Sequence, residues 1–430
     1  MADPRGFLKY DRELPRHRPV PIRVRDWREV YEPFPADAVR RQAARCMDCG
    51  VPFCHDGCPL GNLIPEWNDL VDRGNWVEAS ERLHATNNFP DFTGRLCPAP
   101  CEASCVLGIS AEPVTIKQIE YEIVERAWTE GWLGPIRPAQ RTGRRERRRR
   151  HPAPGGRWPR GGRRATLRSS FDAVLLATGA TVPRDLQVPG RALHGVHQAM
   201  EYLTGANRST EGSLDRPPID AAGKAVVIIG GGDTGADCLG TAHRQGARSV
   251  HQLEILPEPP TARCEEDPWP TWPRILRTCP AHEEGGERLF SASTAELVGD
   301  AAGHVRALRA EQVPAGTSAA GRGTFEPVAG SAVELRCDLV LLALGFSGPE
   351  RQGLVADLGL ALTDRGTVAV DAGWETDVEG VFACGDAVKG QSLVVWAIAE
   401  GRAAAAAVDR RLMGASDLPA PVVPGQLPLR

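Results

Sequence analysis

The sequence contains no long apolar run. Nowhere in its 430 residues do apolar side chains approach the ~18 consecutive positions that a membrane-spanning helix requires. The N-terminal residues lack the apolar segment of a secretory leader, so we expect no secretion. A large excess of one charge is also missing, because the formal net charge is −4, which gives no overall field to attract nucleic acid. These absences predict a cytoplasmic protein that binds neither a membrane nor nucleic acid.

Lysine is nearly absent, so arginine supplies almost all of the positive charge. The only lysines are Lys9, Lys117, Lys224 and Lys389. Arginine is concentrated between residues 141 and 170, where it is mixed with glycine and proline and shows no hydrophobic periodicity. We therefore predict that residues 141–170 form no packed structure.

Cysteine is abundant and unevenly distributed. Five of the twelve cysteines are scattered singly and are interpreted as buried thiols, namely Cys238, Cys264, Cys279, Cys337 and Cys384. The other seven form two runs, Cys46-x2-Cys49-x4-Cys54-x3-Cys58-Pro and Cys97-Pro-x2-Cys101-x3-Cys105. This spacing is similar to that of bacterial ferredoxins, in which one run donates its last cysteine to the other cluster. Two four-ligand iron–sulfur clusters need eight ligands, so one ligand must be a different side chain.

Two other interpretations of the cysteines are open. Structural zinc could be bound at one tetrahedral site by Cys46, Cys49, Cys54 and Cys58. Disulfides are disfavoured by the odd number of clustered cysteines and by the predicted compartment. Spacing alone does not exclude zinc, but an electron relay has a use beside the dinucleotide-binding motifs that follow in the chain.

Hydrophobic patterning changes along the chain. Residues 46–133 predict short helices, notably over 68–84 and 116–128. After residue 170, apolar runs of strand length at 173–177, 226–229, 339–343 and 381–383 predict buried parallel strands. We therefore predict an α/β fold in which a helical iron–sulfur domain precedes a Rossmann-like body with two dinucleotide sites.

A glycine-rich turn marks the first dinucleotide site. Gly230, Gly232 and Gly235 fit G-x-G-x-x-G between a strand and a helix, with Asp233 and Thr234 in the same turn. Such glycines let the backbone approach a pyrophosphate at a helix N-terminus. Glu254, near the end of the next strand, stands where an acidic residue would hold a ribose hydroxyl, although a plain surface carboxylate explains it equally well. Arg244 or Arg263 could instead meet a 2′-phosphate, which leaves NADH and NADPH both open.

A second site is predicted at Gly385 and Asp386, directly after an apolar strand. A carboxylate there can bind the ribityl or phosphate region of a flavin, while the following helix points its N-terminus at the same group. The alternative is an ordinary strand-to-helix turn capped by Asp386. Gly179 and Gly345 end two similar strand segments, an arrangement typical of flavoproteins with two dinucleotide sites.

Taken together, these motifs resemble the small (β) subunit family of NADPH-dependent glutamate synthase. The matching segments are residues 46–58, 97–105, 115–120, 171–184, 226–237, 267–278, 282–285, 385–386 and 391–401. They extend over nearly the whole chain. The segment Asp267-Pro268-Trp269-Pro270-Thr271-Trp272-Pro273 is far more particular than any glycine motif.

The resemblance implies an enzyme in which NADPH reduces FAD and two [4Fe–4S] clusters carry single electrons to a large (α) subunit. That subunit would make glutamate from glutamine and 2-oxoglutarate. The resemblance also implies one oxygen ligand among the eight cluster ligands. It assigns Cys46, Cys49, Cys54 and Glu120 to one cluster, and Cys58, Cys97, Cys101 and Cys105 to the other. No side chain is expected to act as an acid or a base.

The chain departs from the family where the FAD-binding G-x-G-x-x-G fingerprint should stand. That fingerprint belongs shortly after residue 143, yet family-like sequence resumes only at Phe171. A frame slip with a deletion in a GC-rich gene would yield the Arg/Gly/Pro mixture and fits the scarcity of lysine. The alternative is a genuine basic linker, which contains Trp158 as its one aromatic residue.

The predicted division of the chain follows from this interruption. Residues 1–140 form the iron–sulfur domain, 141–170 replace the fingerprint, 171–220 are a residual part of a truncated FAD domain, 221–345 bind NAD(P)H, and 346–430 complete the FAD domain. The alternatives to the electron-input function are an inactive iron–sulfur protein that has lost FAD, and a sibling flavoprotein oxidoreductase with another electron acceptor.

Overall fold

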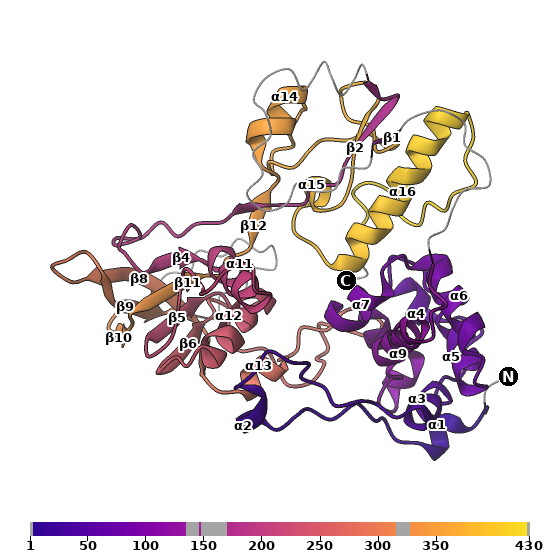
Figure 1. Ribbon diagram of the computed structural model, residues 1–430, viewed down its shortest axis with the longest axis horizontal. Helices are drawn as coiled ribbons and strands as arrows, with labels where there is room; N and C mark the ends of the chain where they lie inside the picture. The colour runs from indigo at the N-terminus through magenta and orange to yellow at the C-terminus, as the bar shows by residue number, and fades with distance from the viewer. Residues whose placement is uncertain (1–2, 135–145, 148–169, 315–326, 428–430) are drawn as a thin grey trace.

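The computed structural model describes residues 3–134, 146–147, 170–314 and 327–427 (Figure 1). A helical N-terminal part, indigo and purple in Figure 1, is followed by an α/β body with two separate parallel sheets. The architecture agrees with the predicted fold class.

Short helices make up the helical part, and most of them pack around one apolar core. They are α1 (Gly6–Lys9), α2 (Val20–Arg23), α3 (Ala36–Ala43), α4 (Phe53–Asp56), α5 (Ile64–Asp72), α6 (Trp76–Thr86), α7 (Pro90–Leu96), α8 (Pro100–Ala103) and α9 (Ile116–Thr129). Proline occupies the first turn of α5, α7 and α8, where its missing N–H costs no hydrogen bond. Trp67, Leu83 and Ile119 are completely buried in the core of this part.

The single helix predicted over residues 68–84 is wrong, because two helices cover this region. α5 ends at Asp72 and α6 begins at Trp76. Gly74 lies between them with φ of 80°, a left-handed conformation that glycine adopts at little cost and that ends a helix. The helix predicted over residues 116–128 is confirmed as α9.

A five-stranded parallel sheet forms the dinucleotide part of the body. Its order is β4 (Val196–Gln198), β11 (Leu339–Leu342), β5 (Ala225–Ile229), β6 (Ser249–Leu253) and β7 (Glu287–Leu289). Helices α11 (Ala199–Thr210) and α12 (Asp233–Arg244) pack against it. Every residue of β5 and β11 is buried, which explains why these strands read as unbroken apolar runs.

Next to this sheet lies an antiparallel one, in the order β10 (Val333–Arg336), β9 (Val305–Gln312) and β8 (Ala292–Gly299). Short helix α13 (Pro280–Glu283) lies before β7 in the chain and contacts α12.

The remaining part of the body has a three-stranded parallel sheet and the long helix α16 (Val394–Met413). The order of the sheet is β1 (Glu146–Arg147), β2 (Ala173–Leu176) and β13 (Val381–Ala383). Two short strands, β3 (Val182–Pro183) and β12 (Phe346–Gly348), pair where the chain crosses between this part and the dinucleotide part. Helices α14 (Ala356–Leu358) and α15 (Asp386–Lys389) complete it.

The predicted irregular segment, residues 141–170, lies mostly outside the described residues. Glu146 and Arg147 are described, and they pair in parallel with Ala173 and Val174. The prediction of no packed structure is therefore wrong for these two positions. The edge of β2 can be paired by backbone groups alone, so the pairing needs no hydrophobic periodicity in the sequence.

Contacts on more than one side join the helical part to the body. Helix α16 packs on α7 and shares one buried core with the helical part, and Arg402 of α16 donates hydrogen bonds to Asn88 Oδ1 (2.7 Å) and to the Ala85 carbonyl (2.8 Å). On the other side, α2 lies beside α13 (Figure 1), where Arg23 donates to Glu284 Oε1 at 2.9 Å. The helical part is thus held against both parts of the body.

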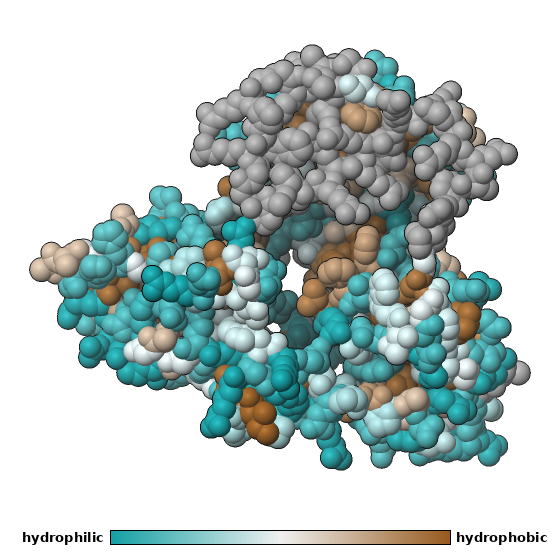
Figure 2. Space-filling model, in the orientation of Figure 1, coloured by the Kyte–Doolittle hydropathy of each residue, from teal (hydrophilic) through white to brown (hydrophobic). Residues whose placement is uncertain are grey.

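The surface in view is mostly hydrophilic, with small separate apolar spots and a hollow between the helical part and the dinucleotide part (Figure 2). Within the ranges the structure describes, none of the helices combines the length and the apolar composition needed to cross a membrane.

Candidate functional site

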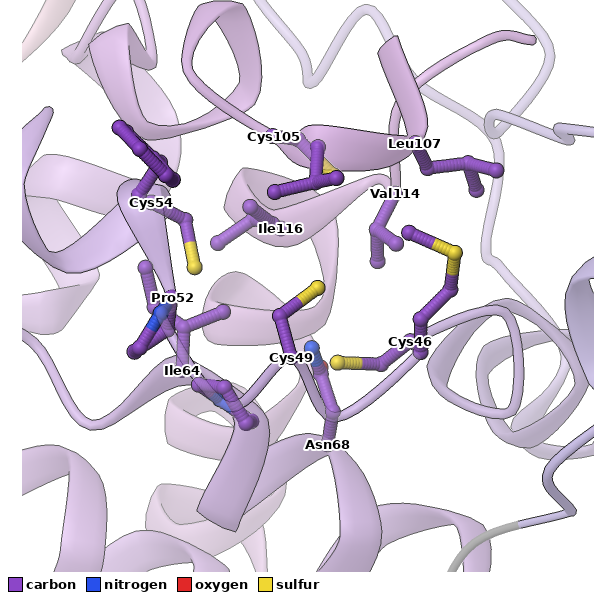
Figure 3. Close-up of a pocket in the computed structure, with 14 residues that line it drawn as sticks. Cys46, Cys49, Pro52, Cys54, Ile64, Asn68, Cys105, Leu107, Val114 and Ile116 are labelled. Carbon is purple, nitrogen blue, oxygen red and sulfur yellow. The ribbon is translucent and has the colours of Figure 1, made fainter. Parts of the chain in front are cut away.

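Four cysteines of the helical part surround one pocket (Figure 3). Cys46, Cys49, Cys54 and Cys105 line it, together with the amide of Asn68. The rest of the lining is apolar, from Met47, Pro52, Phe53, Ile64, Pro65, Val106, Leu107, Val114 and Ile116. We call these four cysteines the first group. Its thiols face one another across an apolar space that water does not solvate well.

Local structure fixes the loops that carry the first group. Cys46 follows the end of α3, where its N–H donates to the Ala43 carbonyl at 3.0 Å. The preceding Arg45 is buried and donates hydrogen bonds of 2.7–3.0 Å to three backbone carbonyls from two other segments of the chain. Trp269, from the dinucleotide part, donates to the Cys105 carbonyl at 3.3 Å, and its ring stacks on Phe53 at 4.7 Å. These contacts hold the thiols in place before any metal binds.

Burial disfavours the deprotonated, thiolate form of these cysteines when no metal is bound. It raises the pKa of Cys46 to about 11 and raises the pKa of Cys54 further still. Metals bind thiolates, not thiols, so a positive metal centre is what would stabilise the deprotonated form here. The donor set and its apolar enclosure fit a metal cluster.

The second group consists of Cys58, Cys97, Cys101 and Glu120. All four are buried, and burial is the largest cause that raises the pKa of each. Nearby charges act in the same direction as burial on the pKa of Cys101, which is raised by Cys58, then Glu102, Cys97 and Glu120. The four side chains therefore lie close together.

Polar neighbours orient the members of the second group. Glu120 Oε1 accepts hydrogen bonds from Asn87 Nδ2 at 2.9 Å and from the Thr93 hydroxyl. Burial raises the Glu120 pKa to about 7, against the opposing effect of these hydrogen bonds. The Cys58 thiol accepts a long hydrogen bond from Asn62 Nδ2 at 3.7 Å.

The structure groups two of the predicted ligands differently from the division predicted for the two clusters, which stays a prediction. The sequence places Glu120 with Cys46 and Cys105 with Cys58, whereas the structure places Cys105 in the first group and Glu120 in the second. The reason is the path of the chain. Helix α9 leaves the first pocket at Ile116 and carries Glu120 one turn further, toward Thr93 of α7. Each cysteine run thus donates its last member to the other group, a fully reciprocal form of the ferredoxin pattern.

The zinc alternative does not fit this arrangement. It requires Cys58 beside Cys46, Cys49 and Cys54, but Cys58 belongs to the second group. In the described part of the chain, no three His, Cys, Asp or Glu side chains gather closely enough to hold a single metal ion. In a [4Fe–4S] cluster each ligand binds a different iron, so the ligands surround a larger body than one ion. The position of Cys58 therefore argues against the zinc site of Cys46, Cys49, Cys54 and Cys58.

The glycine turn after β5 has the geometry of a dinucleotide-binding turn. Gly230 has φ of 127°, and a Cβ there would clash with the Ala343 carbonyl. A Cβ on Gly235 would clash with the Gly230 carbonyl. Gly232 caps α12, and no described atom lies within 4 Å of where its Cβ would stand. The space above Gly232, at the N-terminus of a twelve-residue helix that begins at Asp233, suits a pyrophosphate.

Glu254 lies directly after β6 and against this turn. Its Oε2 accepts the Gly231 N–H at 3.0 Å and its Oε1 accepts the Leu256 N–H at 2.8 Å. Arg244 and Arg263, the two candidates for a 2′-phosphate, are engaged elsewhere. Arg244 pairs with Glu284 at 2.5 and 2.7 Å, and Arg263 donates to the backbone carbonyls of Asp267, Thr271 and Ala103.

The candidate flavin residues come from three places in the chain. Gly179 lies between β2 and β3, Gly345 lies between β11 and β12, and Gly385 and Asp386 lie at the start of α15. Gly385 has φ of 67° and donates its N–H to the buried Glu400 at 2.9 Å, while Asp386 Oδ1 accepts the Ser392 hydroxyl at 2.6 Å. Gly179 and Gly345 both have positive φ, at 74° and 77°. These four residues can hold one side of a flavin, and residues 144–169, where the fingerprint belongs, are outside the described part apart from Glu146 and Arg147.

Sequence reasoning missed the polar residues around the clusters. Asn87 and Thr93 orient Glu120, Asn62 contacts Cys58, and Asn68 lines the first pocket. Asparagine and threonine are common in loops and caps, so no signal in the sequence set these apart. Of these polar residues, only Asn62 could have been found from its spacing, because it stands four residues after Cys58.

Two family models match the chain. Residues 23–132 match dihydropyrimidine dehydrogenase domain II, 4Fe–4S cluster, and residues 160–267 and 305–401 match pyridine nucleotide-disulphide oxidoreductase. These matches and the geometry define the class of protein, an iron–sulfur flavoprotein oxidoreductase with a pyridine-nucleotide domain.

Known relatives cover the chain from end to end. The glutamate synthase [NADPH] small chain of Mycobacterium tuberculosis (strain CDC 1551 / Oshkosh) is 56% identical over 494 residues and covers 100% of both chains. That of Bacillus subtilis (strain 168) is 40% identical, over 97% of this chain and 100% of the relative. The glutamate synthase [NADH] of Schizosaccharomyces pombe is 39% identical, over 96% of this chain and 23% of the relative. The chain belongs to the glutamate synthase small-chain family.

The comparisons confirm the predicted family, the oxidoreductase class and the iron–sulfur domain. The alignment with the Mycobacterium relative extends over 494 residues whereas this chain has 430, so the relative contains residues without a counterpart here. The shortened flavin domain predicted from the sequence stays a prediction. The number of clusters and the identity of their ligands remain predictions.

Proposed function

We propose that the chain is the electron-input subunit of a glutamate synthase. It takes electrons from a reduced nicotinamide dinucleotide and passes them to a large subunit that makes glutamate from glutamine and 2-oxoglutarate. The observation that carries this proposal is the presence of two separate groups of four candidate ligands in the helical part. The buried core around them is continuous with the part of the body that contains β2, β13 and α16, which we call the flavin part.

Each group would hold one [4Fe–4S] cluster. The first would be bound by Cys46, Cys49, Cys54 and Cys105, and the second by Cys58, Cys97, Cys101 and Glu120. When bound, such clusters accept and release one electron at a time. Both hydrogen bonds to Glu120 go to Oε1, so we assign Oε2 to the second cluster.

The dinucleotide would bind at the glycine turn. Gly232 and the N–H groups that begin α12 would meet its pyrophosphate, and Asp233 and Thr234 form the first turn of that helix. Gly179, Gly345, Gly385 and Asp386 would hold the flavin, which is the group that can accept a hydride and release single electrons. The residues of this chain then have to position the nicotinamide ring against the flavin ring. Hydride transfer between the two rings needs no acid or base from the protein.

The packing supports one order of the relay. Cys384, directly before Gly385, and Trp396 of α16 share one buried core with cysteines of both groups. Thr93 of α7, which contacts α16, hydrogen-bonds the second-group ligand Glu120. We therefore infer that the second group receives electrons from the flavin. The first group would then pass them to the large subunit.

The test is the protein purified anaerobically. The proposal predicts about eight iron atoms per chain, flavin absorbance, and oxidation of NADH or NADPH with an artificial electron acceptor. Iron without flavin, and without dinucleotide oxidation, would support the inactive iron–sulfur protein instead. Adding the large subunit should give glutamate from glutamine and 2-oxoglutarate, whereas activity with another acceptor protein alone would favour a sibling oxidoreductase. Sequencing the gene across codons 140–172 decides between a frame slip and a genuine basic linker.

A further inference from the structure

We propose that Glu254 makes this subunit select NADH, the dinucleotide without a ribose 2′-phosphate, over NADPH. The inference rests on the proposed function and names its electron donor. Membership of the family does not decide the donor, because the relatives are named for NADPH in some organisms and for NADH in others.

The position of Glu254 is that of the residue that meets the adenosine ribose. In a β–α–β dinucleotide unit this ribose lies beside the glycine turn, at the carboxyl end of the second strand. Here β5 leads into the turn and the neighbouring parallel strand β6 ends at Leu253. Glu254 is the next residue, and its carboxylate lies so close to the turn that a Cβ on Gly231 would clash with its Oε2.

The carboxylate is held in place from both sides. Gly231 and Leu256 each donate a backbone N–H to a different oxygen, at 3.0 and 2.8 Å. The side chain is half-buried, so it cannot swing away into solvent without losing both hydrogen bonds. The negative charge is therefore a fixed feature of the ribose site.

A fixed carboxylate discriminates between the two dinucleotides by simple chemistry. A 2′-hydroxyl can donate a hydrogen bond to a carboxylate oxygen. A 2′-phosphate is a phosphate monoester that carries about −1.5 to −2 charges at pH 7, so it meets the carboxylate with repulsion. Like charges placed next to each other at a binding site are a common means of rejecting the wrong ligand.

The arginines that could balance the charge of a 2′-phosphate are bound to other groups of the protein. Arg244 is bound to Glu284, which Arg23 also holds, and Arg263 donates three hydrogen bonds to backbone carbonyls. Arg277 lies over the Trp272 ring at 4.1 Å and donates to the Pro273 carbonyl at 2.9 Å.

Burial lowers the pKa of Arg277, and the charge of Asp233, at the start of α12, opposes this effect. The three residues that follow Glu254 are Ile255, Leu256 and Pro257, which offer no cation. The 2′-phosphate of NADPH would therefore meet a carboxylate at the position where a cation is needed to bind it.

The inference is tested by measuring the dissociation constants of NAD⁺ and NADP⁺ by calorimetry on the anaerobically purified full chain. The oxidised forms bind without turnover. We expect NAD⁺ to bind about 10-fold or more tightly than NADP⁺ at low salt, and the preference to shrink as salt screens the charges. In Glu254→Gln the side chain can still accept the Gly231 N–H but carries no charge, so NADP⁺ binding should improve until the preference is lost.

The matched control is Glu211→Gln, which removes the same charge from an exposed carboxylate at the end of α11, on the opposite edge of the sheet. It should leave the preference unchanged. Equal or tighter binding of NADP⁺ by the unmodified chain would overturn the inference, as would a preference that survives in Glu254→Gln. Failure of both dinucleotides to bind a folded chain would instead contradict the proposed function.

Discussion

Asn87 donates a hydrogen bond of 2.9 Å to Glu120, a carboxyl group that is only 5% exposed. The two residues belong to separate elements, because Asn87 follows α6 and Glu120 lies on α9. Thr93 of α7 donates to the same oxygen. Three elements therefore fix the orientation of one buried carboxyl, which is the expected arrangement around a metal ligand whose geometry matters.

Replacement of Glu120 by alanine should release the second cluster. The variant loses one of four ligands and should retain about half of the iron of the unmodified chain, with the signal of one cluster missing from its EPR spectrum. Glu125→Ala is the matched control, since Glu125 is an exposed carboxylate on the same helix that pairs with Arg95 at 3.2 Å. Full iron content in Glu120→Ala would show that Glu120 is not a ligand.

Asn68 should tune the first cluster. It is completely buried, its amide lines the first pocket, and neither its Nδ2 nor its Oδ1 has a hydrogen-bond partner among the described residues, so the amide can donate to a cluster sulfur. A hydrogen bond to a ligand sulfur favours the reduced, more negative cluster. Asn68→Leu should lower the midpoint potential of one cluster by about 20–60 mV, the equivalent of one hydrogen bond in a one-electron couple.

A redox titration followed by EPR measures this shift. Asn62→Leu is the companion variant, because Asn62 contacts Cys58 of the second group. It should move the potential of the other cluster. If Asn68→Leu left both potentials unchanged, Asn68 would have only a packing role.

His282 should make the dinucleotide part less stable in mild acid. Burial lowers its pKa below the ordinary 6.5, Arg288 acts in the same direction, and Asp233 opposes them. Its neutral form accepts the Cys279 N–H at Nδ1 and hydrogen-bonds Gln252 through Nε2. Below pH 6.5 the unfolded chain binds a proton that the folded chain does not, so stability falls as the pH drops.

Thermal unfolding between pH 7.5 and 5.5 tests this prediction. The melting temperature of the unmodified chain should fall over this range, and the fall should be smaller in His282→Gln. His304→Gln is the control, because the His304 side chain is 63% exposed. Identical pH dependence in all three proteins would contradict the role given to His282.

Arg23 should fasten the N-terminal segment that contains α2 to the dinucleotide part. Its side chain is 1% exposed and pairs with Glu284, whose side chain is fully buried, at 2.9 Å. Removal of one partner of a buried ion pair typically costs 3–5 kcal/mol, and because Arg244 still neutralises Glu284 we expect about 3 kcal/mol for Arg23→Ala. Urea unfolding measures the loss. Arg25→Ala, at an exposed position two residues away, should cost less than about 0.5 kcal/mol, and equal effects of the two variants would exclude the proposed fastening.

The sequence predicted the local features of the fold well. β5 and β11 are recognisable because central parallel strands are buried on both faces, and the turn from Gly230 to Gly235 because only glycine fits its close backbone contacts. The break at Gly74 was missed because the apolar spacing continues across it.

The cluster ligands show where prediction from sequence stops. Spacing and family resemblance propose which residues are ligands, but the positions of these residues depend on the course of α9 through the core, which brings Glu120 to Thr93 and away from the first pocket. The neutralisation of Arg244 by Glu284 likewise joins residues 40 positions apart, and no local pattern indicates it.

The most direct measurement is an EPR spectrum of the full chain, purified anaerobically and reduced with NADH. The proposed relay predicts that NADH alone produces the signal of a reduced [4Fe–4S] cluster, and that Glu120→Ala weakens it. If dithionite reduced the clusters but neither NADH nor NADPH did so, the chain would hold clusters without being the electron-input subunit.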